Sequence, residues 1–296
     1  MEIKDVEKSL SGTKYEPFIG FLQKISLKNH TYDNHYKMGN EQQGYFSIKI
    51  REITEQNVIN SVNLLKIIND KENIINQNVE IIKNNNNIII ISKWLEGKQP
   101  IDNNRESLPV FFSKLAVLNK NNIINGPFTS MYLDYKYFDN INELIDWEIN
   151  NHKKYLTRNI DIKLVLDILE YLKNGISCII NEDMNCGNLF ITSEEKYKII
   201  DTEWFIKGSN LYQFQHFDYF AFDEKKWHKI TDEAGECYRA YFEELNISYK
   251  DANDQIRAIE LLNVLRENTY WKHTGKDNDK EIERRIKIVI GKEKYI

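Results

Sequence analysis

Residues 176–192 read Ile-Ser-Cys-Ile-Ile-Asn-Glu-Asp-Met-Asn-Cys-Gly-Asn-Leu-Phe-Ile-Thr, and after a short polar turn residues 197–204 read Tyr-Lys-Ile-Ile-Asp-Thr-Glu-Trp. Apolar runs alternate with polar clusters along this stretch, a pattern typical of short buried strands joined by turns. Asp183, Asn188 and Asp201 lie beside these apolar runs. A single Asp or Asn there is most often a turn residue, because both side chains hydrogen-bond their own backbone. Three oxygen-bearing side chains, each beside a buried run, indicate a site that can hold a metal ion.

The spacing of these three residues is the one used for phosphoryl transfer. That chemistry needs a base for the proton of the attacking hydroxyl, and an Asn and an Asp that hold magnesium against the nucleotide phosphates. In protein kinases the order is Asp, four residues, Asn, and then a strand that ends in the metal-binding Asp. Asp183, Asn188 and Asp201 follow the same order. The pattern therefore favours a kinase-like site over a coincidence of turn residues.

The stretch resembles the motifs of the aminoglycoside phosphotransferase and choline kinase superfamily. The loop of that family usually reads His-(Gly or Asn)-Asp-x-x-x-(Gly)-Asn and its metal motif Ile-Asp-x-Glu. Here the letters are Asn-Glu-Asp-Met-Asn-Cys-Gly-Asn over residues 181–188 and Ile-Asp-Thr-Glu over residues 200–203. The resemblance covers most of residues 20–225. It implies Asp183 as the catalytic base, and Asn188 and Asp201 as ligands of Mg²⁺ beside bound ATP (or GTP).

The resemblance also implies a fold. The expected class is α+β, a bilobal protein kinase-like fold with a β-rich N-terminal lobe and a mainly helical C-terminal lobe. The nucleotide-binding lobe is expected over residues 1–95, and the catalytic and acceptor-binding lobe over residues 96–296. Hydrophobic periodicity and turn signals agree with this division. They predict strands over 18–25, 36–38, 45–50, 79–82 and 88–94, and helices over 55–69, from 107, from 140, over 164–172 and near 230–245, 253–271 and 280–290.

Two segments of the β-rich part are candidates for nucleotide binding. Lys49 lies between two isoleucines on a predicted strand. The strand pattern alone makes it an exposed edge lysine, whereas the resemblance makes it the lysine that contacts the phosphates. The segment Ser-Lys-Trp-Leu-Glu-Gly over residues 92–97 resembles the family's hinge. Backbone groups of Lys93, Trp94 and Leu95 would then meet the adenine edge, although a strand running into a glycine turn explains the same letters.

Two departures from the family pattern bear on activity. Kinase-like proteins supply a glutamate from the helix expected over 55–69 to orient the lysine, but the middle of this helix carries Asn57, Asn60 and Asn63 and no acid. Either Glu55 reaches Lys49 from the first turn, or an Asn has replaced the carboxylate and the ion pair is absent. Asn181 stands where the family usually has a His that braces the catalytic loop. An Asn can hydrogen-bond there, but it cannot fill the same volume or carry a proton.

Two functions therefore stay open. The first is an ATP- and Mg²⁺-dependent phosphotransferase, a small-molecule kinase that transfers the γ-phosphate to a hydroxyl group. The second is a catalytically silent nucleotide-binding pseudokinase with a regulatory or structural role. Retention of Asp183, Asn188 and Asp201 together favours the enzyme, because a silent protein needs none of the three.

The acceptor is expected to be a small cationic molecule with hydroxyl and amine groups, such as an amino alcohol or an aminoglycoside. In the related families the acceptor pocket lies downstream of the metal motif. Acids and aromatic rings alternate there in this chain, and aromatic faces hold ammonium groups. The alternative is that most of these aromatics are core residues. Glu203 is either the acid that choline kinase-like members also carry at this place or an exposed surface acid, and Asp218 resembles a family aspartate that braces the catalytic loop. The residues concerned are Glu203, Trp204, Phe205, Tyr212, Phe217, Asp218, Tyr219, Phe220, Phe222, Asp223, Glu224, Trp227, Tyr270 and Trp271.

Composition excludes several other classes. The 296 residues carry 40 basic and 45 acidic side chains, a net charge of −5 that gives no indication of nucleic acid as a partner. No apolar run approaches the roughly 20 residues of a membrane span, and the charged N-terminus does not resemble a signal sequence. The three cysteines lack metal-ligand spacing, which favours a cytoplasmic location. Scattered histidines and the lack of a Gly-x-Ser-x-Gly elbow argue against a zinc enzyme or a hydrolase. The oligomeric state is left open.

Overall fold

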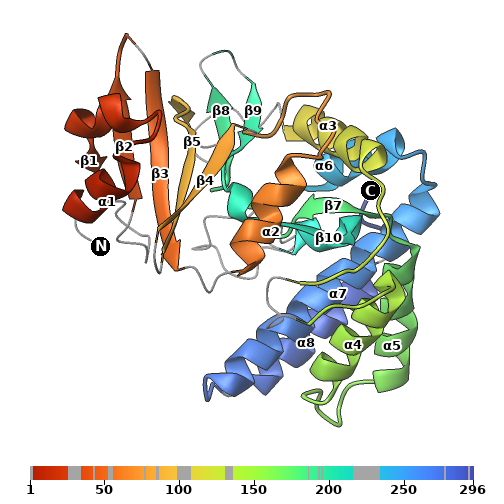
Figure 1. The fold of residues 1–296 in the computed structure, drawn as a ribbon. Helices are drawn as coiled ribbons and strands as arrows, with labels where there is room; N and C mark the ends of the chain where they lie inside the picture. The colour runs from red at the N-terminus through yellow and green to blue at the C-terminus, as the bar shows by residue number, and fades with distance from the viewer. Residues whose placement is uncertain are drawn as a thin grey trace.

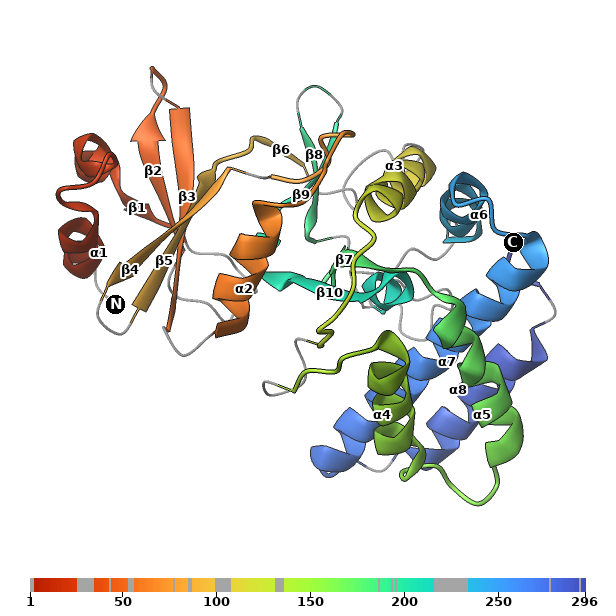
Figure 2. The same cartoon turned by 45° about the vertical axis from the view of Figure 1, so that its right-hand side comes forward.

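The computed structural model describes most of the chain, with short gaps. The described ranges are 3–25, 35–42, 44–52, 56–76, 78–84, 87–98, 108–130, 136–185, 187–192, 194, 196–215, 234–276, 278–292 and 294–296. A β-sheet dominates the N-terminal part, and helices make up most of the remainder (Figures 1 and 2). The predicted α+β class is confirmed.

The N-terminal sheet has five strands in the order β1-β2-β3-β5-β4, and each neighbouring pair is antiparallel. The strands are β1 (Gln23–Lys24), β2 (His35–Asn40), β3 (Gly44–Glu52), β4 (Val79–Asn84) and β5 (Asn87–Lys93). The hairpin predicted from residues 79–82 and 88–94 is thus confirmed as β4 and β5.

Side-chain alternation gives this sheet two different faces. Ile48 and Ile50 of β3 point into an apolar cluster that helix α1 (Ile3–Leu10) and the 3₁₀ helix η1 (Glu16–Phe21) cover. Lys49, between them, belongs to the opposite face. That face is turned toward helix α2 (Gln56–Leu65), which lies between the sheet and strands β7 and β10 (Figures 1 and 2). The predicted amphipathic helix is confirmed here, with Val58, Val62 and Leu65 buried.

The C-terminal part is built from the helices that periodicity predicts. Asn140 caps the second of them, since its side chain accepts hydrogen bonds from the backbone N–H groups of Asn142 and Glu143. The helix predicted over 164–172 is an α-helix followed by the 3₁₀ helix η4 (Glu170–Asn174). The α-helices are α3 (Leu108–Asn121), α4 (Ile141–Lys153), α5 (Ile162–Leu169), α6 (Ala234–Glu244), α7 (Tyr249–His273) and α8 (Asp279–Gly291). No helix within the described residues is long and apolar enough to cross a membrane.

Two small sheets stand between the large sheet and the helices. Strand β7 (Ser177–Asn181) pairs with β10 (Phe205–Ser209), a strand that the sequence patterns do not predict. Strand β8 (Leu189–Thr192) pairs with β9 (Tyr197–Ile199) and with the short β6 (Gly97–Lys98). At Gly97 a Cβ atom would lie 2.0 Å from the Ile191 carbonyl oxygen, so only glycine allows this approach.

His152 of helix α4 contacts helix α7, and its burial should make the free energy of unfolding depend on pH. His152 Nδ1 lies 2.8 Å from Thr269 Oγ1, and burial lowers the pKa of His152 from 6.5 to about 4. The charged or titratable groups around it are Glu148, Arg266, Lys154 and His273.

Because the folded pKa is the lower one, the unfolded chain takes up a proton first as the pH falls below 6.5. The free energy of unfolding should therefore fall between about pH 6.5 and pH 4, by about 3 kcal/mol from this residue. His152→Gln should flatten that part of the curve, measured by urea unfolding at a series of pH values. An unchanged slope in the variant would contradict this role.

Candidate active site

The pairing of β8 with β9 brings two of the predicted site residues together. Leu189 and Ile199 are directly opposite each other, and the Ile200 N–H donates to the Asn188 carbonyl at 2.9 Å. Asn188 comes just before β8, while Asp201 comes two residues after β9. The residues predicted to hold magnesium are therefore on adjoining backbone segments, because a short hairpin joins their strands.

Three asparagines, Asn181, Asn185 and Asn188, hold the loop from residue 181 to residue 188. Asn181 Oδ1 accepts from the Asp183 N–H at 3.0 Å, and Asn181 Nδ2 donates to the Asp201 carbonyl at 2.7 Å. Asn185 Oδ1 accepts from the backbone N–H of Asn188 at 3.2 Å. Asn181, which replaces the expected histidine, thus ties the loop that carries Asp183 to the segment that carries Asp201. The Asn181 amide therefore supports the loop by hydrogen bonding, whereas the expected histidine ring would support it by packing.

The Asp183 carboxylate accepts hydrogen bonds from two of these amides. Asn188 Nδ2 donates to Asp183 Oδ2 at 3.0 Å, and Asn185 Nδ2 donates to Asp183 Oδ1 at 3.4 Å. Burial raises the pKa of Asp183 to about 6, although the two amides act in the opposite direction. At pH 7 the carboxylate is mostly ionised and is a stronger base than an exposed one.

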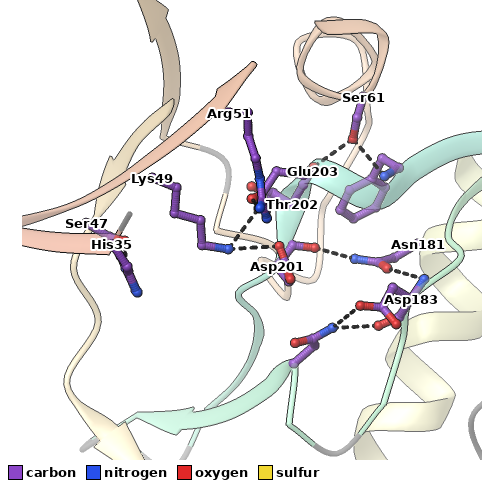
Figure 3. Close-up of polar contacts among 12 residues, drawn as sticks. His35, Ser47, Lys49, Arg51, Ser61, Asn181, Asp183, Asp201, Thr202 and Glu203 are labelled. Carbon is purple, nitrogen blue, oxygen red and sulfur yellow. Dashed lines mark hydrogen bonds and ion pairs between the residues drawn. The ribbon is translucent and has the colours of Figure 1, made fainter. Parts of the chain in front are cut away.

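Lys49 is the centre of a buried group of charges. Its Nζ lies 2.9 Å from Asp201 Oδ1 and 2.9 Å from Glu203 Oε2, and Arg51 Nη2 lies 3.1 Å from Glu203 Oε1 (Figure 3). Burial opposes the charge on Lys49, but the two carboxylates outweigh it and raise the pKa of the ammonium. Burial and the neighbouring Glu203 raise the pKa of Asp201. Burial alone would raise the pKa of Glu203 too, yet Lys49 and Arg51 lower it on balance.

Comparison with known proteins finds similarity in structure where sequence comparison finds none. No protein-family model and no curated protein sequence matches the chain. A thermostable mutant of aminoglycoside phosphotransferase APH(4)-Ia, in a ternary complex with AMP-PNP and hygromycin B, is similar with a TM-score of 0.63 and 14% identity, over 97% of this chain and 98% of that one. The chain has the aminoglycoside phosphotransferase fold.

Two further solved structures share this fold. A candidate fructosamine-3-kinase of Haemophilus somnus 129PT is similar with a TM-score of 0.59 and 15% identity, over 96% of both chains. An ethanolamine kinase of Plasmodium vivax is similar with a TM-score of 0.56 and 14% identity, over 96% of this chain and 86% of that one. The predicted protein kinase-like fold is confirmed.

Within the aminoglycoside phosphotransferase fold of this chain, Lys49 finds different partners from those that the sequence predicts. Glu55 lies outside the described residues. Among the residues that are described, the carboxylates on Lys49 belong to Asp201 and Glu203. The interpretation of Glu203 as a surface acid is wrong, since its side chain is only 3% exposed. Arg51 escaped prediction altogether, although its position two residues after Lys49 places both cations on one face of the strand.

The predicted hinge begins at Lys93, the last residue of β5, which is an interior strand of the sheet. The Trp94 N–H donates to the Tyr45 carbonyl at 2.9 Å, and the Lys93 carbonyl accepts from Asn76 Nδ2 at 2.9 Å. A base could therefore use the Trp94 carbonyl or the Leu95 N–H, but not the Trp94 N–H. Lys37 Nζ lies 4.8 Å from the centroid of the Trp94 ring, so a cation from β2 covers this end of the segment.

The donor set of the site fits a magnesium ion that is held together with phosphates. Asp201 and Asn188 offer carboxylate and amide oxygens, and magnesium usually takes one or two protein carboxylates and completes its shell with phosphate oxygens and water. The described residues contain no group of three His, Cys, Asp or Glu side chains that could hold a metal ion. A site completed by the nucleotide is the kind that these residues suit.

Proposed function

We propose that the protein is a phosphotransferase that moves the γ-phosphate of ATP (or GTP) to a hydroxyl group of a small molecule, with Mg²⁺. The observation that carries this proposal is one connected polar group made of Lys49, Asp201, Asn181, Asp183 and Asn188. Such a group supplies the positioning and charge neutralisation on which phosphoryl transfer depends. The fold, shared with aminoglycoside and ethanolamine kinases, supports the same class of reaction.

Each residue has a distinct task in this proposal. Lys49 contacts the phosphates of the nucleotide. Asp201 and Asn188 would hold the metal, which neutralises phosphate charge as it develops. Asp183 aligns the acceptor hydroxyl and takes its proton, for which a pKa of about 6 is well suited near neutral pH. The amides of Asn185 and Asn188 keep the Asp183 carboxylate in one orientation.

A nucleotide should stabilise the fold measurably if this proposal is correct. A ligand present at 100 times its dissociation constant adds roughly 2.7 kcal/mol to the free energy of unfolding. ATP or GTP with Mg²⁺ should therefore raise the melting temperature by several degrees, and Asp201→Ala should reduce that rise. A thermal-shift titration of both nucleotides, with and without Mg²⁺, measures this. Melting curves that neither nucleotide moves would remove the basis of the proposal.

The acceptor in this proposal is a cationic molecule, an amino alcohol or aminoglycoside. The names of the similar proteins include an aminoglycoside and ethanolamine as acceptors, which supports an amine. The acids and aromatics at 217–227 that suggested it from the sequence lie outside the described residues, as does Asp218. Glu203 no longer belongs to that argument, because Lys49 and Arg51 neutralise it. Phe205 and Tyr212 are core residues, each at most 1% exposed.

An acceptor panel tests this part of the proposal separately. ADP release should accelerate with hydroxylated amines, and much less with neutral sugars, because the acids proposed for the acceptor site, Asp218, Asp223 and Glu224, would attract a cation. Rates are compared at equal acceptor concentration, with the N-acetylated form of each amine as its matched control. If only neutral sugars are phosphorylated, the proposal of a cationic acceptor is wrong, whereas the proposal of a phosphotransferase is unaffected.

A further inference from the structure

Helix α2 occupies the place from which protein kinases supply a glutamate to their lysine. The ten residues of α2, Gln-Asn-Val-Ile-Asn-Ser-Val-Asn-Leu-Leu, include no acid. The Lys49 side chain is 26% exposed, and a charged partner stabilises such a half-buried ammonium group, because removing a charge from water is unfavourable. Among the described residues, the carboxylates on Lys49 come from another part of the chain.

Glu203 has the geometry for that role. One of its oxygens accepts from Lys49 and the other from Arg51, so the carboxylate bridges two cations of the same strand. Glu203 as a residue is 2% exposed, and the Arg51 side chain is 9% exposed. Charge-assisted bonds to both oxygens fix the carboxylate in direction as well as in charge. Asp201 also touches Lys49, but Asp201 is the residue that would hold the metal.

Ser61 connects helix α2 to this carboxylate. Its Oγ donates to the Thr202 carbonyl at 2.7 Å and accepts from the Phe205 N–H at 2.7 Å (Figure 3). These two peptide groups flank Glu203 on either side. Ser61 is fully buried and out of reach of water, so these two bonds satisfy polar groups that would otherwise have no partner. The helix therefore fixes the backbone that carries the carboxylate, without providing the carboxylate.

We propose that Glu203 is the positioning residue for Lys49, that Arg51 holds Glu203 in place, and that Ser61 couples helix α2 to the pair. The proposal rests on the proposed function, since it assigns how the nucleotide-binding lysine is aimed. It is distinct from a role for Glu203 as a metal ligand, because both oxygens of Glu203 already bond to cations of β3.

The test measures AMP-PNP binding by calorimetry across a range of Mg²⁺ concentrations, for Glu203→Gln, Arg51→Met and Ser61→Ala. A glutamine can accept from only one of the two cations, so Glu203→Gln should raise the dissociation constant about 10-fold. Arg51→Met and Ser61→Ala should raise it by a smaller factor, and neither should add to the effect of Glu203→Gln. The Mg²⁺ concentration that gives half-maximal binding should stay unchanged. Glu194→Gln and Asn63→Ala, at exposed positions, are the controls.

The outcomes separate the proposals. Wild-type protein that binds no AMP-PNP overturns the proposed function and this assignment with it. Wild-type binding with all three variants within about twofold overturns the assignment alone. A Glu203→Gln effect that appears as a shift in the Mg²⁺ requirement also overturns it, because Glu203 would then be a metal ligand. If Glu203→Gln does not fold, as circular dichroism would reveal, the Arg51 and Ser61 variants decide the question by the same criteria.

Discussion

Asp183→Asn should lower turnover by roughly 100-fold or more while the protein continues to bind nucleotide, because general-base catalysis contributes that much. The substitution keeps the shape of the side chain and removes its ability to take a proton. It also leaves only one oxygen for the amides of Asn185 and Asn188, which now share the two carboxylate oxygens. A small loss of stability should therefore accompany the loss of rate.

The rate is measured as ADP release, with an acceptor from the panel or as slow hydrolysis without one. Asp167→Asn is the matched control, since Asp167 is exposed on helix α5 and far from the loop in sequence. Binding of AMP-PNP is measured in parallel for each protein. Equal rates in wild type and Asp183→Asn would favour the pseudokinase, the alternative function that the sequence leaves open.

Glu148→Ala should cost about 3 to 5 kcal/mol of stability, because it leaves a buried guanidinium without its counter-charge. Glu148 of helix α4 is 3% exposed, and its two oxygens lie 2.7 and 2.6 Å from Arg266 Nη2 on helix α7. Arg266 also bonds Gln215, whose amide donates to the Glu182 carbonyl beside Asp183. Losing the pair should therefore loosen the support of the catalytic loop as well as the packing of two helices.

Urea unfolding gives the free energy directly, and two variants make the comparison specific. Asp146 is on the same helix as Glu148 and forms an exposed ion pair with Lys173 of η4. Asp146→Ala removes this pair and should cost less than about 1 kcal/mol. The double variant Glu148→Leu with Arg266→Met removes both charges, and should be more stable than Glu148→Ala. A loss below about 1 kcal/mol for Glu148→Ala would show that Arg266 finds another partner.

The position of Asp183, Asn188 and Asp201 near one another could be predicted from the sequence because its determinants are local. Asp183 and Asn188 are five positions apart, and the short hairpin of β8 and β9 brings Asp201 back beside them. Lys49 is placed on its strand by simple alternation. The partner of Lys49 is a different matter, because Glu203 is 154 positions away and meets it only once the sheet faces the helical part. The metal motif includes Glu203, yet nothing in its pattern says whether it faces metal, lysine or solvent.

Strand β10 was not predicted from the sequence, because it too depends on contacts with a distant part of the chain. Its residues include Lys207, Gly208 and Ser209, which do not form an alternating apolar run, and it is a strand because β7 offers a pairing edge. Gly208 opposes Cys178 across that pair. The strand depends on tertiary context more than on its own propensity.

Lys49 and Asp201 have a consequence for selectivity that follows from their contact with each other. One would bind phosphate and the other a divalent cation, and in the free protein each neutralises the other at 2.9 Å. A phosphate that bound Lys49 alone would leave the Asp201 carboxylate without its cation, and a metal ion that bound Asp201 alone would leave Lys49 with Glu203 as its remaining carboxylate partner. The metal–nucleotide complex brings a phosphate for Lys49 and a metal ion for Asp201 at the same time. Its binding would replace the Lys49–Asp201 ion pair and leave neither side chain without an opposite charge. Under the proposed function, the free protein should therefore bind the metal–nucleotide complex more tightly than the nucleotide or the metal ion alone.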